Sequence, residues 1–142
     1  HYPLRRQRQM CIRDRLNITP CPKPRMTQAD KWRKRQSVLK FFAFRDAVRQ
    51  YKESKVVLQS PYHAHHLEFE SFEIEFHVPM PKSWSKKKKG YMNGSAHQQR
   101  PDLDNYLKAW KDSVYEEDAI VWRVKASKLW TDGLGHIIVN YL

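Results

Sequence analysis

The chain has 142 residues, of which 40% are hydrophobic, and its 27 Lys and Arg against 15 Asp and Glu give a formal net charge of +12. This length suits one domain around one core, and the basic balance favours nucleic acid as the partner over an anionic membrane, because no amphipathic anchor is evident. No apolar run approaches the ~18 residues of a membrane helix and no secretory pattern is present, so we expect a soluble protein of the cytoplasm.

The N-terminal part divides into an arm and the start of a domain. Residues 1–15 are rich in Arg and Gln and lack hydrophobic periodicity, so we expect either a disordered basic arm or an assembly artefact. We assign residues 16–142 to one folded domain. It opens with a short predicted strand at 16–19 and a proline-rich stretch at 20–24, which cannot be helical.

A helix is expected after the prolines. It should begin near Thr27 to Asp30, because both residues are suitable N-caps. Residues 38–51 continue the helical pattern, with side chains near one face at steps of three and four. Phe41 and Phe42 in this stretch are expected in the core or in a subunit interface.

Residues 67–78 form the clearest predicted strand. Apolar residues occupy one face from residue 72 onward, and Glu73, Glu75 and His77 occupy the other. Because Leu67 and Phe69 are out of step with this alternation, a bulge or turn is expected near residues 71–72.

A basic and then polar stretch follows, at residues 82–99. We expect a short helix over 82–90 and a mobile loop over 90–99. The stretch contains no acidic residue, and it directly precedes an acidic motif. We therefore predict that Lys86, Lys87, Lys88 and Lys89 contact DNA phosphates. The alternative, a solvated lysine surface, is common in proteins.

The C-terminal part predicts one helix and two strands. Leu103, Leu107, Trp110 and Val114 mark a helix by their spacing. Alternating residues predict strands over 120–129 and 136–141, and Asp132-Gly133 is a turn dipeptide between them.

The most informative segment is acidic. It reads Arg100-Pro101-Asp102-Leu103-Asp104-Asn105-Tyr106-Leu107-Lys108, and Glu116-Glu117-Asp118 follows. At a loop-to-helix junction Asp102 and Asp104 can converge, whereas inside a helix they would diverge by roughly 200°. Acids repel phosphate unless a divalent cation lies between them, and Mg²⁺ takes carboxylates together with substrate phosphate. Acids inside a basic chain therefore indicate a metal-dependent enzyme acting on a phosphodiester backbone.

Ordinary structural roles are the alternative for each acid taken singly. An Asp at a helix N-terminus caps free N–H groups, and Asp104 with Lys108 has the spacing of a helix ion pair. Neither role explains an Asp-x-Asp-Asn motif with Asp118 following it. Arg100 could either brace one of these carboxylates or meet a phosphate.

These motifs resemble the RusA family of Holliday junction resolvases from phages and prophages. The segments that carry the resemblance are residues 100–109 and 115–121, and Pro22-Lys23-Pro24-Arg25 fits the family's usual opening. The resemblance covers about residues 16–142. Tyr106 departs from the family pattern, which usually has an aliphatic residue there, and Glu117 stands where an Asp is common.

The resemblance implies a fold and a set of roles. The fold would be α+β, a single small domain with a mixed β-sheet packed by helices, assembled as a homodimer. Asp102, Asp104 and Asp118 would bind the metal, Mg²⁺ or Mn²⁺ as a substitute, and Lys108 would be the catalytic lysine. The role of Glu117 stays open. Arg25 and Arg100 join the lysine run as predicted DNA contacts.

The function predicted from the sequence is Mg²⁺-dependent resolution of four-way DNA junctions by paired cuts, in recombination and repair. The rivals are a broader fork and flap nuclease and a non-catalytic DNA-binding module. Five Trp, six Phe and seven Tyr exceed what a core of this length readily hides. We therefore expect the Phe41–Phe42 helix and the Phe72–Val78 strand to line the dimer interface.

Overall fold

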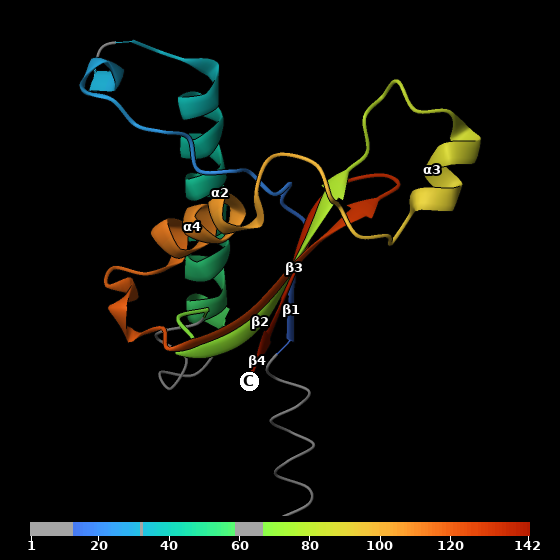
Figure 1. Ribbon diagram of the computed structural model, residues 1–142. Coiled ribbons are helices and arrows are strands. Elements are labelled where there is room, and N and C mark those ends of the chain that lie inside the picture. Colours follow the sequence, from blue (N-terminus) through green and yellow to red (C-terminus); the bar gives the residue numbers. More distant parts are fainter. Residues whose placement is uncertain (1–12, 32, 59–66) are drawn as a thin grey trace, which may run out of the picture.

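The fold is a four-stranded mixed sheet with helices on one face (Figure 1). The computed structural model describes residues 13–31, 33–58 and 67–142. The strands are β1 (Arg13–Leu16), β2 (Ser71–Pro79), β3 (Arg123–Thr131) and β4 (His136–Tyr141), in the spatial order β1-β4-β2-β3. β2 runs parallel to β3 and antiparallel to β4, and β1 pairs antiparallel with β4. The predicted α+β class with a mixed sheet is confirmed.

Three α-helices are described: α2 (Gln36–Leu58), α3 (Lys86–Met92) and α4 (Leu103–Val114). Figure 1 shows α2 and α4 on the same side of the sheet, whereas α3 stands apart, beyond the sheet's end. Two short 3₁₀ helices, η1 (Gln28–Lys31) and η3 (Asp118–Ile120), lie in the connections. Among the described helices, none combines the length and hydrophobicity needed to cross a bilayer.

The core lies between the sheet and the pair of helices α2 and α4. Alternation along β2 directs Phe72, Ile74 and Phe76 toward these helices, and all three are 0% exposed. They meet Phe41, Phe44 and Val48 from α2 and Tyr106, Ala109, Trp110 and Val114 from α4. The strand face predicted from the sequence is confirmed, and so is the break before it, since the strand begins at Ser71.

The same burial corrects one expectation. β2 is an interior strand, between β4 and β3, and its apolar face is covered by the chain's own helices. The Phe72–Val78 strand therefore cannot present Phe72, Ile74 or Phe76 to a second subunit. On α2, Phe41 is buried in the core and Phe42 packs partly against it.

The predicted starts of β1, α2 and β3 were wrong. The first strand is Arg13–Leu16 rather than 16–19, so Arg13, Asp14 and Arg15 of the expected arm pair with β4; residues 1–12 lie outside the described residues. The long helix begins at Gln36, because the Asp30 carboxylate accepts a hydrogen bond from the Thr27 N–H (2.6 Å) and closes a local turn instead.

Strand β3 begins at Arg123 and not at residue 120, where it was predicted to begin. The Glu117 carboxylate accepts from the Ala119 N–H (3.1 Å) and caps η3. Asp132 and Gly133 do form a turn before β4, with Gly133 at a φ of 117° that favours glycine. The strands that it joins are not neighbours, however, because β2 lies between them.

Candidate active site

Helix α4 carries two of the three predicted catalytic acids, and its buried face fixes its position. Tyr106, Ala109, Trp110, Ser113 and Val114 are buried, and the Tyr106 ring stacks on Phe76 with centroids 5.6 Å apart. Burial raises the pKa of Tyr106 to about 12. The tyrosine that departs from the family pattern is therefore a core residue, and the site residues occupy the opposite, exposed face.

Asp102 and Asp104 lie at the N-terminal end of α4, at the predicted loop-to-helix junction. Asp102 is the N-cap residue, with extended backbone angles (φ −68°, ψ 151°), but its carboxylate makes no capping hydrogen bond. Asp104 lies in the first turn, and both side chains are exposed. Capping therefore does not occupy the Asp102 carboxylate, which remains available to a ligand.

The ion pairs of α4 differ from the Asp104–Lys108 pair that the i,i+4 spacing suggested. In the described part of the chain, Asp112 pairs with Lys23 (3.1 Å) and Lys111 lies 3.9 Å from Asp118, but no ion pair joins Asp104 to Lys108. Lys108 is exposed, one helical turn after Asp104. An i,i+4 ion pair therefore does not neutralise these two side chains in this structure.

The segment that leads into the acids is anchored from β3. The Lys128 ammonium donates to the carbonyl oxygens of Gln99 and Pro101, the latter at 2.6 Å. The Arg100–Pro101 peptide bond is cis. From the other side, the Lys23 backbone N–H donates to the Asn105 carbonyl at 3.0 Å. Two separate parts of the chain thus fix the loop-to-helix segment that carries Asp102 and Asp104.

Asp118 lies at the opposite end of α4. It begins η3, four residues after the helix ends, and a 12-residue helix is about 18 Å long. Asp118 lines a groove of about 1040 Å³ together with Arg49, Lys52, Lys111, Asp112 and Glu116. Among the described residues, no group of three or more His, Cys, Asp and Glu side chains could hold a metal ion. The structure thus places Asp102 and Asp104 at one end of α4 and Asp118 at the other.

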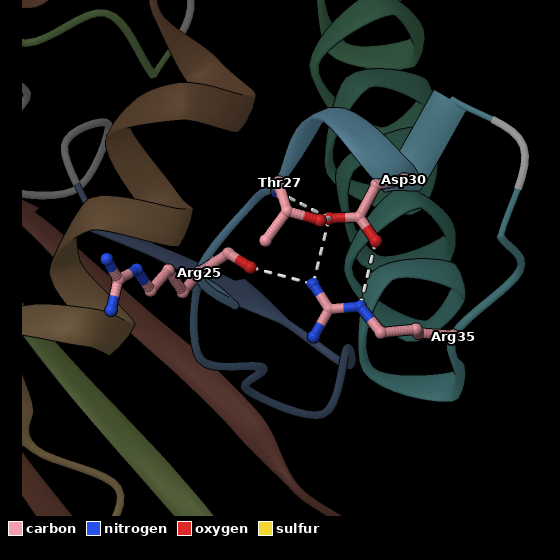
Figure 2. Close-up of polar contacts among 4 residues, drawn as sticks. All are labelled: Arg25, Thr27, Asp30 and Arg35. Carbon is pink, nitrogen blue, oxygen red and sulfur yellow. Dashed lines mark hydrogen bonds and ion pairs between the residues drawn. The ribbon is translucent and has the colours of Figure 1, made fainter.

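Arg25 is held by a polar cluster in the loop before α2 (Figure 2). Arg35 donates through Nε and Nη2 to both carboxylate oxygens of Asp30 (2.8 Å each) and also to the Arg25 carbonyl (2.7 Å). These bonds from Arg35, and one from the Thr27 N–H, hold the pKa of Asp30 well below its usual range. Figure 2 shows the Arg25 side chain pointing away from Arg35, and it is exposed.

The remaining predicted DNA contacts are accessible. Arg100 is exposed, and so are Lys86, Lys87 and Lys88 on α3, whereas Lys89 is half-buried. Lys88 places its ammonium 4.1 Å from the centroid of the Trp84 ring. A short helix forms in this stretch as predicted, but over Lys86–Met92 rather than 82–90, with Ser85 as its N-cap.

Sequence reasoning missed Lys128, although a signal was present. Val124, Ala126, Lys128 and Trp130 share one face of β3, since their β2 partners are Phe72, Ile74, Phe76 and Val78. A lysine on the core-facing side of a strand requires a specific hydrogen-bond partner. The proximity of Lys111 to Asp118 was also missed, because the hydrophobic pattern of the sequence does not reveal the position of η3.

A small α+β domain with a formal net charge of +12 and two exposed carboxylates at a helix N-terminus has the charge layout expected of an enzyme that acts on nucleic acid. The comparison with protein families is more specific: residues 17–140 match the model of the endodeoxyribonuclease RusA family. The chain therefore belongs to the RusA family, whose activity is that of a hydrolase cutting DNA at Holliday junctions. A search of curated proteins found no match to the chain.

Proposed function

We propose that this protein is a homodimeric, Mg²⁺-dependent endonuclease that resolves four-way DNA junctions by cutting two strands at symmetric positions. We place this activity in the cytoplasm of a bacterial or phage-infected cell. The observation that carries the proposal is the pair of exposed acids at the N-terminus of α4, one of them an N-cap that makes no capping hydrogen bond, in a chain of the RusA family.

The donor set suits a hard divalent cation. Mg²⁺ is usually bound by one or two carboxylates, with substrate phosphate and water completing the shell, so Asp102 and Asp104 would hold it, with Asp118 as a further ligand. When bound, the ion supplies Lewis-acid activation of the phosphate and lowers the pKa of a water. Mn²⁺ has the same preference for oxygen ligands.

The chain's own cations have separate roles. Lys108 is exposed on the same helix as Asp104 and unpaired with it, so its ammonium can approach the scissile phosphate and neutralise charge that develops on the phosphoryl oxygens. Arg100 and Arg25 lie on either side of the loop-to-helix segment that carries Asp102 and Asp104, and they bind neighbouring DNA phosphates. Lys128 does not reach the substrate; it positions the backbone on which Asp102 lies.

The position of Asp118 supports the homodimer. Within one subunit, Asp118 lies the length of α4 away from Asp102 and Asp104. In a two-fold dimer, each residue contact occurs twice, with the roles of the subunits exchanged. A second copy lying antiparallel along α4 would bring its Asp118 to Asp102 and Asp104 of the first copy and complete two equivalent sites. Two equivalent sites suit the two-fold symmetry of a four-way junction.

Single substitutions test the acids. Asp102→Asn, Asp104→Asn and Asp118→Asn should each abolish cleavage of a synthetic four-way junction in Mg²⁺, while junction affinity is retained or raised because repulsion is relieved. Asp132→Asn is the matched control, an exposed acid in the turn before β4, and should cleave like the wild type. Wild-type turnover by Asp104→Asn would refute the assignment.

A mixing experiment tests the shared site. Asp104→Asn and Asp118→Asn, each inactive alone, are co-refolded to give mixed dimers. If Asp118 acts across the interface, a mixed dimer contains one intact site and one doubly substituted site, so it should nick one strand per junction. If all three acids act within one copy, no dimer has an intact site and the mixture stays inactive.

A further inference from the structure

The helix α3 carries an aromatic side chain that the fold does not use. Tyr91 is 85% exposed, more than any other aromatic side chain in the described residues, and no residue of α3 is buried. Tyr91 follows the lysine run and precedes the segment that leads toward α4. Figure 1 shows α3 projecting from the end of the sheet, away from α2 and α4. Core packing therefore does not account for this tyrosine.

α3 is nevertheless firmly attached to β3. Trp84, just before the helix, packs against Trp130 with ring centroids 4.9 Å apart, and His97 stacks on the same Trp130 at 3.8 Å. Trp130 is buried, and its backbone exchanges hydrogen bonds with Gly94 and Ser95 just after the helix. The helix is thus anchored through its two flanks, while the ring of Tyr91 stays exposed.

The surface around Tyr91 has the size and charge of a nucleotide site. Ser85, Lys87, Lys88 and Tyr91 line a shallow hollow of about 330 Å³, at the small end of the range for ligand sites. Among the residues that line this hollow, Tyr91 supplies the aromatic ring. The neighbouring Trp84 ring is covered by the ammonium of Lys88 and packs on Trp130. Proteins that bind single strands combine cations that follow the phosphates with aromatic rings on which bases stack.

We propose that Tyr91, with Lys87 and Lys88, forms a stacking site for an unpaired DNA base, so that α3 binds a nucleotide whose pairing is lost at the branch point. The proposal rests on the proposed function for the identity of the substrate as DNA. A protein partner is disfavoured by charge, since residues 82–100 contain no acid and several lysines. Such a surface complements a polyanion.

The test compares Tyr91→Ala with Tyr91→Phe, which keeps the ring. Binding to a 12-nucleotide oligo(dT) and to a linear duplex is measured by fluorescence anisotropy in EDTA, so that no cleavage occurs. We expect Tyr91→Ala to lose about 5- to 150-fold in affinity for oligo(dT), as expected for one stacked base. Tyr91→Phe should stay within about twofold of the wild type, and duplex affinity should be unchanged in both variants.

The outcomes separate this inference from the proposed function. Equal losses for oligo(dT) and duplex, or an unchanged oligo(dT) affinity in Tyr91→Ala, would overturn the stacking site even if the wild type resolves junctions. A wild type that cuts no junction but shows the Tyr91-dependent preference for oligo(dT) would leave the stacking site standing without the nuclease. Thermal unfolding of each variant verifies that the domain remains folded.

Discussion

Lys128 provides the sharpest test of how the acids are positioned. Lys128→Met keeps the aliphatic stem on β3 but removes the ammonium that donates to the Gln99 and Pro101 carbonyls. Hydrogen bonds to a charged group contribute about 1.5–3 kcal/mol each. Because the Gln99 side of the loop is exposed, water can replace one of the two bonds. We therefore expect a loss of about 2 kcal/mol in the free energy of unfolding.

The effect on cleavage should exceed the effect on binding. Displacement of catalytic groups by about 1 Å can cost about 100-fold in rate, so junction cleavage by Lys128→Met should fall about 10- to 100-fold, with junction affinity near that of the wild type. The matched control is Lys125→Met on the same strand, whose ammonium lies 3.4 Å from Glu73 and whose side chain is 79% exposed.

Urea unfolding and single-turnover cleavage are the assays for both lysine variants. The control should lose less than about 1 kcal/mol, as expected for a surface ion pair, and should cleave normally. Equal stability and equal cleavage rates for Lys128→Met and Lys125→Met would refute the positioning role of Lys128.

Three further outcomes are expected. Ile74→Ala, at a side chain that is 0% exposed, should lower the free energy of unfolding by about 2–5 kcal/mol in urea titrations; a loss below about 1 kcal/mol would contradict the described core. Replacing Lys86–Lys89 with Ala should flatten the salt dependence of junction binding by ~0.9 log units of slope per lost phosphate contact, and an unchanged slope would mean a solvated surface. The pKa of Asp30 is depressed, so the stabilising contribution of this carboxylate is present above its unfolded pKa of about 3.9 and is lost as the pH falls through the folded value. Arg35→Gln should remove this acid-sensitive part of the stability, measured as the urea midpoint against pH. An identical pH profile in wild type and variant would count against the Asp30–Arg35 interaction.

The sequence was sufficient where one periodicity dominates a segment. β2 alternates without interruption from residue 72, and α4 repeats its apolar residues at helical spacing, so both were predicted with nearly the observed bounds. Side-chain hydrogen bonds to the backbone determine the starts of α2 and η3. Asp30 and Glu117 compete there with helix and strand propensity, and single-sequence patterns do not weigh that competition.

The strand order and the full acid set depend on long-range geometry. The pattern of the last two strands suggested neighbours, but the parallel pairing of β3 with β2 moves β4 to the other side of β2. The sequence predicted the loop-to-helix junction at Asp102 and Asp104. It could not show that Asp118 lies at the far end of α4 from these two acids, nor that Lys128 holds the preceding loop against the sheet.

The central claim is tested most directly by incubating the wild-type protein with a synthetic four-way junction, in Mg²⁺ and in EDTA, beside a linear duplex and a fork. We expect paired nicks at symmetric positions in the junction, only when Mg²⁺ is present, and little cutting of duplex or fork. Binding of the junction without cleavage in Mg²⁺, undiminished cleavage in EDTA, or equal cutting of the three substrates would contradict the account.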